Sequence, residues 1–329
     1  MEQDKAAQSI KRGSLYFMLF IIAFAILDLA SGLFFHFKGV LSVLLPEVLI
    51  WIGAILFFGI HKINPLQFMR VKRFHIGSAF LVVFIGILLF PVTSFFSALS
   101  MIFFTNEIST TMYTLSGSYP YPVALLLVAL LPALGEEITC RGIVLNSFDT
   151  GRPIKAILVS ALAFGAFHMN FNQFSYAFVI GLIMALAVEA TDSIWSSVII
   201  HFVFNGTSTT FLYLMPKFIE FYNKLVGESG AGEVMDHTEL LNQTGSATPL
   251  QMLGAAAVYL IPAMICLVLI GLLLYAIACI NNRESLFSFW VSGKYKEERR
   301  QLKKIRTFYP TMIIALVLCL LMAVLVQIL

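Results

Sequence analysis

The fold class is decided by residues 250–280, which read LQMLGAAAVYLIPAMICLVLIGLLLYAIACI and carry no charged side chain. A helix of about 20 apolar residues is long enough to cross the hydrocarbon core of a bilayer. The whole chain has the same character: 59% of its 329 residues are hydrophobic and only 12% are charged. Soluble domains have about 25% charged residues. The composition therefore excludes a soluble globular enzyme, a disordered tail protein and a nucleic-acid binder, and predicts a multi-spanning membrane protein.

Further apolar runs along the chain complete the prediction of an all-α polytopic protein with about nine transmembrane helices. We expect these spans at residues 15–35, 40–60, 77–104, 121–148, 154–170, 176–190, 193–214, 250–280 and 309–329. The first run is too long to be trimmed as a signal peptide. The four cysteines lie in apolar stretches without a CxxC pair, so neither a disulfide framework nor a zinc knuckle is expected.

The basic residues predict the orientation of these spans, because cytoplasmic loops retain positive charge. With nine spans and a cytoplasmic N-terminus, most of the 21 Lys and Arg residues lie on the cytoplasmic side. The exceptions are Lys38, Lys217 and Lys224. This arrangement predicts a multi-pass protein of the cell membrane. The compact loops and the lack of a targeting extension are typical of a bacterial plasma-membrane protein.

The chain divides into three regions: N-terminal transmembrane helices (1–119), a central transmembrane core (120–214), and a C-terminal part (215–329) with an acidic outer loop, two spans and a basic cytoplasmic segment. That basic segment, 281–308, combines aromatic residues with the run KYKEERRQLKKIR. Such a pattern fits an interfacial helix on anionic lipid. A positive-inside anchor with no binding role is the interpretation that we favour.

Ionisable and polar side chains are concentrated in spans four, five and seven. Span four contains ALGEEITCRG, span five ends in AFGAFHMN, and span seven reads SIWSSVIIHFVFNG. Ionisable groups inside the hydrocarbon are costly, so each is a candidate functional residue. The candidates are Glu136, Glu137, Arg141, His168, His201 and Asn205.

Helix geometry predicts that these side chains reach similar depths. Glu136 and His168 both lie roughly 20 Å from the turn that joins their spans, and His201 and Asn205 lie roughly 12 and 18 Å into span seven. Glu137 and Arg141 are four residues apart and can pair on one helix face, whereas Glu136 is rotated away from that face.

Two chemistries are compatible with this set. A carboxylate beside an imidazole can hold and deprotonate water, and an imidazole beside an amide can stabilise an oxyanion. Alternatively, Glu136, His168 and His201 supply three ligands with an open fourth position, as in a catalytic zinc site. A third interpretation is a purely structural network. The other intramembrane acids, Asp28 and Glu47, have no histidine nearby in sequence, and we interpret them as structural.

Three motifs in this order resemble those of the CPBP family, the CAAX-processing and bacteriocin-processing intramembrane proteases. They are the glutamate pair Glu136-Glu137 with Arg141, the FxxxH motif that ends in His168, and the HxxxN motif of His201 and Asn205. The segment TDSIWSSVIIHFVFN also resembles the family's approach to the third motif. The resemblance covers residues 120–207 and implies an all-helical intramembrane endopeptidase.

By this resemblance, Glu136 and His168 activate water, His201 and Asn205 stabilise the tetrahedral intermediate, and Glu137 and Arg141 support the site. Family members are often described as metalloproteases, but a metal-free glutamate mechanism has been argued for the CAAX-processing branch, and we favour it here. We expect the substrate to be a small membrane-associated peptide or protein. The other functions considered are a proton-coupled transporter, since buried Glu and His also build proton relays, and a non-catalytic bacteriocin-immunity protein.

Overall fold

The computed structural model describes residues 2–35, 39–104, 119–149, 153–229, 248–287 and 306–328. Every regular element in these ranges is a helix, which confirms the all-α prediction. Eight helical segments are long and apolar enough to cross a membrane. Most of the predicted acidic outer loop and most of the basic segment 281–308 lie outside the described residues.

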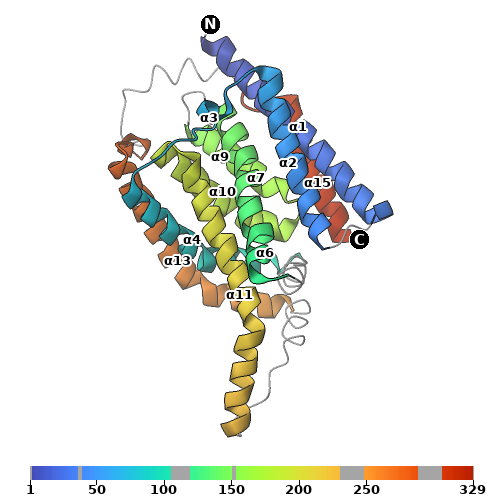
Figure 1. Cartoon of the computed structure of the whole chain (residues 1–329), viewed down its shortest axis with the longest axis vertical. Coiled ribbons are helices and arrows are strands. Elements are labelled where there is room, and N and C mark those ends of the chain that lie inside the picture. Colours follow the sequence, from blue (N-terminus) through green and yellow to red (C-terminus); the bar gives the residue numbers. More distant parts are fainter. Residues whose placement is uncertain are drawn as a thin grey trace.

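Figure 1 shows the helices gathered in one bundle with two flanks. On one flank lie α1 (Glu2–Ala30), α2 (Val40–His61) and α15 (Pro310–Ile328). The other flank consists of α4 (Ile76–Ser100) and α13 (Pro249–Ile280), which lie side by side. The helices that carry the predicted site residues lie between these flanks.

The fourth predicted span is one continuous helical segment, Tyr121–Phe148, with two π-helical stretches. In chain order it consists of α6 (Tyr121–Leu125), η2 (Leu126–Leu130), α7 (Leu131–Glu137), η3 (Ile138–Leu145) and α8 (Asn146–Phe148). π-helical turns are rare and are frequently found at functional sites. Here η3 begins directly after Glu137 and contains Arg141.

The fifth and sixth predicted spans form a helical hairpin whose turn contains His168. Helix α9 (Pro153–Phe167) has only 15 residues, fewer than the expected 154–170, and α10 (Phe171–Thr191) starts earlier than expected. The turn is built by Met169 in a left-handed conformation, with φ of 49°, and by Asn170, whose side chain caps α10 by accepting from the Gln173 N–H. His168 therefore lies just beyond a helix end, where its side chain can face inward.

Helix α11 (Ile194–Ser229) follows α10 after a short turn and extends beyond the rest of the bundle, as Figure 1 shows. Three short helical segments complete the described chain: η1 (Ser31–Phe35) follows α1, α3 (Pro65–Phe68) precedes α4, and η4 (Glu284–Leu286) follows α13. Apolar packing surrounds the central helices on both sides. One buried cluster joins α1, α9 and α15, and a second joins α4, α10, α11 and α13.

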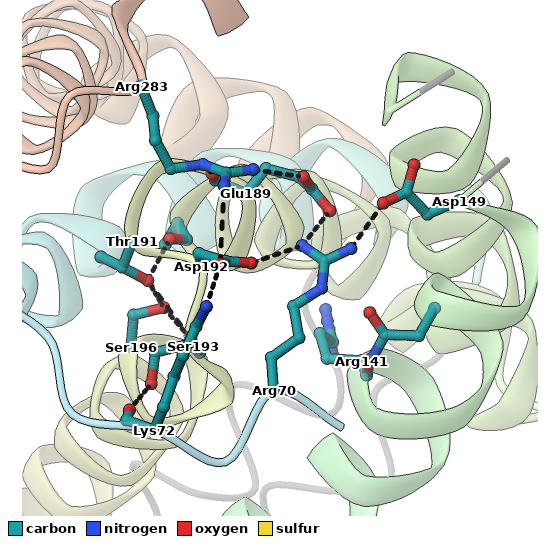
Figure 2. A network of polar contacts seen from close by, with 12 residues as sticks. Arg70, Lys72, Arg141, Asp149, Glu189, Thr191, Asp192, Ser193, Ser196 and Arg283 are labelled. Carbon is teal, nitrogen blue, oxygen red and sulfur yellow. Dashed lines mark hydrogen bonds and ion pairs between the residues drawn. The ribbon is translucent and has the colours of Figure 1, made fainter. Parts of the chain in front are cut away.

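A network of charged side chains joins the ends of four segments at one end of the bundle (Figure 2). Arg70, in the loop before α4, donates to Asp149 Oδ2 at 2.6 Å and to Glu189 Oε1 at 2.8 Å. Asp192, in the α10–α11 turn, pairs with Lys72, and Arg283, after α13, binds the Glu189 carbonyl oxygen. The network therefore holds the start of α11, which lies seven residues before His201.

Burial lowers the pKa of Arg70, but the carboxylates of Glu189, Asp149 and Asp192 more than compensate and raise it above its ordinary value. In the sequence, Arg70 is one of several basic residues between α2 and α4 and has no feature that distinguishes it from the others. In the structure its side chain is only 14% exposed. The signal that could have identified it is the occurrence of three acids, Asp149, Glu189 and Asp192, at the ends of neighbouring spans.

Candidate active site

The first pair in the site consists of Glu136 on α7 and His168 in the α9–α10 turn. His168 Nε2 lies 3.8 Å from Glu136 Oε2, and both side chains are largely buried. His168 Nδ1 lies 2.7 Å from the carbonyl oxygen of Phe164. Because a carbonyl can only accept, we infer that Nδ1 carries the proton and that Nε2 faces Glu136 with its lone pair. Glu136 Oε2 has no hydrogen-bond partner among the described residues, so it is available to a water molecule.

The second group consists of Glu137, Arg141 and His201, and it is almost fully buried. Arg141 donates to Glu137 Oε1 at 2.7 Å, the pairing that the four-residue spacing predicted. His201 Nδ1 lies 3.0 Å from the same carboxylate oxygen. Arg141 also donates to the Gly181 carbonyl oxygen at 3.2 Å, which ties the site to α10. A buried charge is stable only when it is paired. Glu137 and Arg141 form such a pair, although Glu137 Oε2 and Arg141 Nε have no hydrogen-bond partner among the described residues.

Phe164 lies between the two groups. Its ring centroid is 5.0 Å from the His168 ring and 5.7 Å from the His201 ring, both in edge contact. The Arg141 guanidinium carbon is 4.3 Å from the same ring centroid. Five of the six predicted residues are therefore brought into one cluster around this phenylalanine, which the FxxxH motif places four residues before His168.

Asn205, the sixth predicted residue, lies one helical turn after His201 on α11. Its side-chain amide donates to the Val128 carbonyl oxygen at 3.4 Å, in the π-helical stretch η2. His201 meanwhile directs Nδ1 to Glu137. The two residues share the helix face that the spacing predicts, but each has a separate partner in this arrangement, so an oxyanion would recruit them by replacing or extending these contacts.

The predicted zinc alternative can be tested against the positions of the donor atoms. Within the described ranges, no group of three or more His, Cys, Asp or Glu side chains is placed to hold a metal ion. Glu136 and His168 face each other, whereas His201 faces Glu137. As arranged here, the three proposed ligands do not converge on one point and do not fit a zinc centre.

Sequence reasoning assigned Glu47 a structural role, but the structure places it beside the site. Glu47 on α2 is 6% exposed, and its carboxyl group packs against Gly135, the residue before Glu136. Its Oε2 atom has no hydrogen-bond partner among the described residues. The signal in the sequence is a lone acid in an apolar span that has no lysine or arginine. Asp28, by contrast, lies on an exposed part of α1.

Comparison with known proteins identifies the family of the central region. Residues 117–207 match the family described as Type II CAAX prenyl endopeptidase Rce1-like. All six predicted site residues fall within this match, and it confirms the predicted CPBP family. At the family level the match supports a CAAX-type intramembrane protease. No curated protein and no solved structure matches the chain in the same comparisons.

Proposed function

We propose that this protein is an intramembrane endopeptidase that hydrolyses a peptide bond of a membrane-associated peptide or protein. The observation that carries the proposal is the pairing of Glu136 with His168: a carboxylate with a free oxygen faces an imidazole whose other nitrogen is held by a backbone carbonyl. This pair can bind a water molecule between an acceptor on each side, and the family match supports its use in proteolysis.

In the proposed reaction, Glu136 takes a proton from this water as the water oxygen attacks the carbonyl carbon of the substrate. His168 Nε2 accepts a hydrogen bond from the same water and orients it. When the tetrahedral intermediate collapses, the carbon–nitrogen bond breaks and the departing amine takes the proton from Glu136. The carboxylate is thereby restored, and the carbonyl carbon ends as a carboxylic acid.

His201 and Asn205 are proposed to stabilise the negative oxygen of the intermediate. The Glu137 carboxylate accepts the hydrogen bond from His201 Nδ1. Through this contact the buried Glu137 carboxylate holds the His201 ring in place, which gives Glu137 a definite supporting role. Arg141 in turn holds Glu137 in place.

The test is cleavage of a library of membrane-anchored peptides, prenylated and unprenylated, by purified protein in detergent. We expect the wild-type protein to cleave and Glu136→Gln and His168→Ala to be inactive while remaining folded. Metal content is measured on the same samples, and one bound zinc per active protein would contradict the metal-free mechanism. Cleavage that survives in both variants would overturn the site assignment. If the purified protein is instead reconstituted into lipid vesicles, accumulation of the peptide inside them without cleavage would favour a transporter.

A further inference from the structure

The carboxyl group of Glu47 is an unusual feature of the membrane-spanning region. It is buried, and its Oε2 atom has no hydrogen-bond partner among the described residues. The buried cation of this region, Arg141, already binds Glu137 and the Gly181 carbonyl. An isolated carboxylate in such surroundings is very costly, whereas a neutral acid avoids that cost. A neutral carboxylic acid is a hydrogen-bond donor.

The position of this donor is determined by Gly135. A methyl group added at residue 135 would collide with Glu47 Oε2 and approach Ile50. The carboxyl group of Glu47 therefore occupies the space that a side chain at this point of α7 would fill. The next residue in the chain is Glu136, the proposed base. Glycine in ALGEE thus allows an acid from α2 to reach the backbone beside the proposed base.

Glu136 also has a buried oxygen without a partner, Oε2, and no direct hydrogen bond joins it to Glu47. Among the described residues, three buried carboxyl oxygens of this region have no hydrogen-bond partner, on Glu47, Glu136 and Glu137. Such surroundings are those in which an ordered water is stable. The helices packed against α2 contribute further titratable groups. They are Glu136 and Glu137 on α7, Cys140 and Arg141 on η3, and Tyr16 on α1, whose hydroxyl is bonded to Thr139.

We propose that Glu47 is a positioning residue of the active site: as a neutral acid it donates a hydrogen bond, through one water molecule, to the Glu136 carboxylate. This inference rests on the proposed proteolysis for its functional meaning. Glu47 keeps the Glu136 carboxylate and its water at the place where the water can attack, and it transfers no proton itself. Its contribution is to geometry, so its loss lowers kcat and leaves KM nearly unchanged.

The first experiment compares two substitutions of nearly equal size. Glu47→Gln retains a neutral donor, whereas Glu47→Met has none. We expect Glu47→Met to lower kcat by up to about a hundredfold, with KM and thermal stability close to those of the wild type, and Glu47→Gln to restore most of the loss. Asp28→Asn, which removes an intramembrane acid from an exposed part of α1, is the matched control. Full activity of Glu47→Met, or equal loss in Glu47→Gln, would overturn the proposal.

A second experiment does not depend on finding a substrate. Infrared difference spectra at neutral pH report the carbonyl stretch of protonated carboxylic acids. We expect a band that is lost in Glu47→Gln, is kept in Asp28→Asn, and shifts in frequency in Glu136→Gln and Gly135→Ala. The proposed contact between Glu47 and Glu136 would be overturned if the frequency of the band were unchanged in Glu136→Gln, or if no band were lost in Glu47→Gln. The band result holds even if the proposed proteolysis fails, so the two failures can be distinguished.

Discussion

At the scale of single residues, Glu136 is the group whose removal should be most damaging to catalysis and least damaging to the fold. Among the described parts of the chain its side chain makes no ion pair with a lysine or arginine, and one of its oxygens has no hydrogen-bond partner. We expect Glu136→Gln to lower kcat/KM by about 10²- to 10⁴-fold, the range for loss of a general base. Single-turnover cleavage and thermal unfolding of the same sample measure the two effects. A variant that lost activity only by unfolding would contradict this assignment.

The neighbouring residue, Glu137, should behave in the opposite way. It is fully buried between Arg141 and His201, and its removal leaves a buried guanidinium without its charge partner. We expect Glu137→Ala to destabilise the protein by about 3–5 kcal/mol. Because the two charges act as a unit, the double substitution Glu137→Ala with Arg141→Met should cost less than the sum of the two single changes. Unfolding by denaturant in detergent gives the three free energies, and strict additivity would argue against the pairing.

At the scale of helices and turns, the charge network in Figure 2 explains how α11 is held. Arg70 bonds to Glu189 at the end of α10 and to Asp149 at the end of span four, and the Ile194 N–H donates to the Arg70 carbonyl oxygen at 3.3 Å. We expect Arg70→Met to increase hydrogen exchange in the α10–α11 turn and to lower kcat, because His201 lies on α11. Arg70→Lys should rescue little, since one ammonium cannot make the forked contacts. Unchanged exchange in this turn would contradict the role of the network.

The pH dependence of this network follows from the sign of the Arg70 shift. Its pKa is raised in the folded protein above that of an unfolded arginine. The stabilisation is therefore fully present below the unfolded pKa and is lost only as the pH rises through the folded pKa. We therefore expect the difference in unfolding temperature between wild type and Arg70→Met to be constant from about pH 7 to about pH 10. Thermal unfolding across this range checks it. A difference that declined within the range would mean that Arg70 loses its proton there.

Sequence patterns predict some elements of the fold and of the site but not others. Hydropathy and the four-residue spacing predict the long spans and the Glu137–Arg141 pair, because both depend on local helix geometry. The end of α9 before His168 depends on the backbone of Met169 and Asn170, and the π-helical turns of span four depend on packing against other helices. The positions of Glu47 and Arg70 are determined by partners more than 75 residues away in sequence, which a single sequence does not reveal.

At the scale of the whole molecule, the α9–α10 hairpin makes the topology independent of whether α9 crosses the bilayer fully. Asp149, just before α9, and Glu189, at the end of α10, both bind Arg70, so the hairpin begins and ends at the same end of the bundle. A helix of 15 residues is about 22 Å long, shorter than a bilayer core of about 30 Å. The prediction of nine spans and the eight long helices of the structure therefore lead to the same orientation for every other helix.

This orientation can be measured with single cysteines in a variant that lacks the four native ones. We propose that the N-terminus is cytoplasmic, which places Gln3 and Arg306 on the cytoplasmic side and Thr248, the cap of α13, on the outer side. An impermeant thiol reagent applied to intact cells should label Thr248→Cys and spare Gln3→Cys and Arg306→Cys until the cells are opened. The reverse labelling pattern would show that the protein has the opposite orientation in the membrane. Labelling of Gln3→Cys and Thr248→Cys from the same side would require a different number of crossings between them.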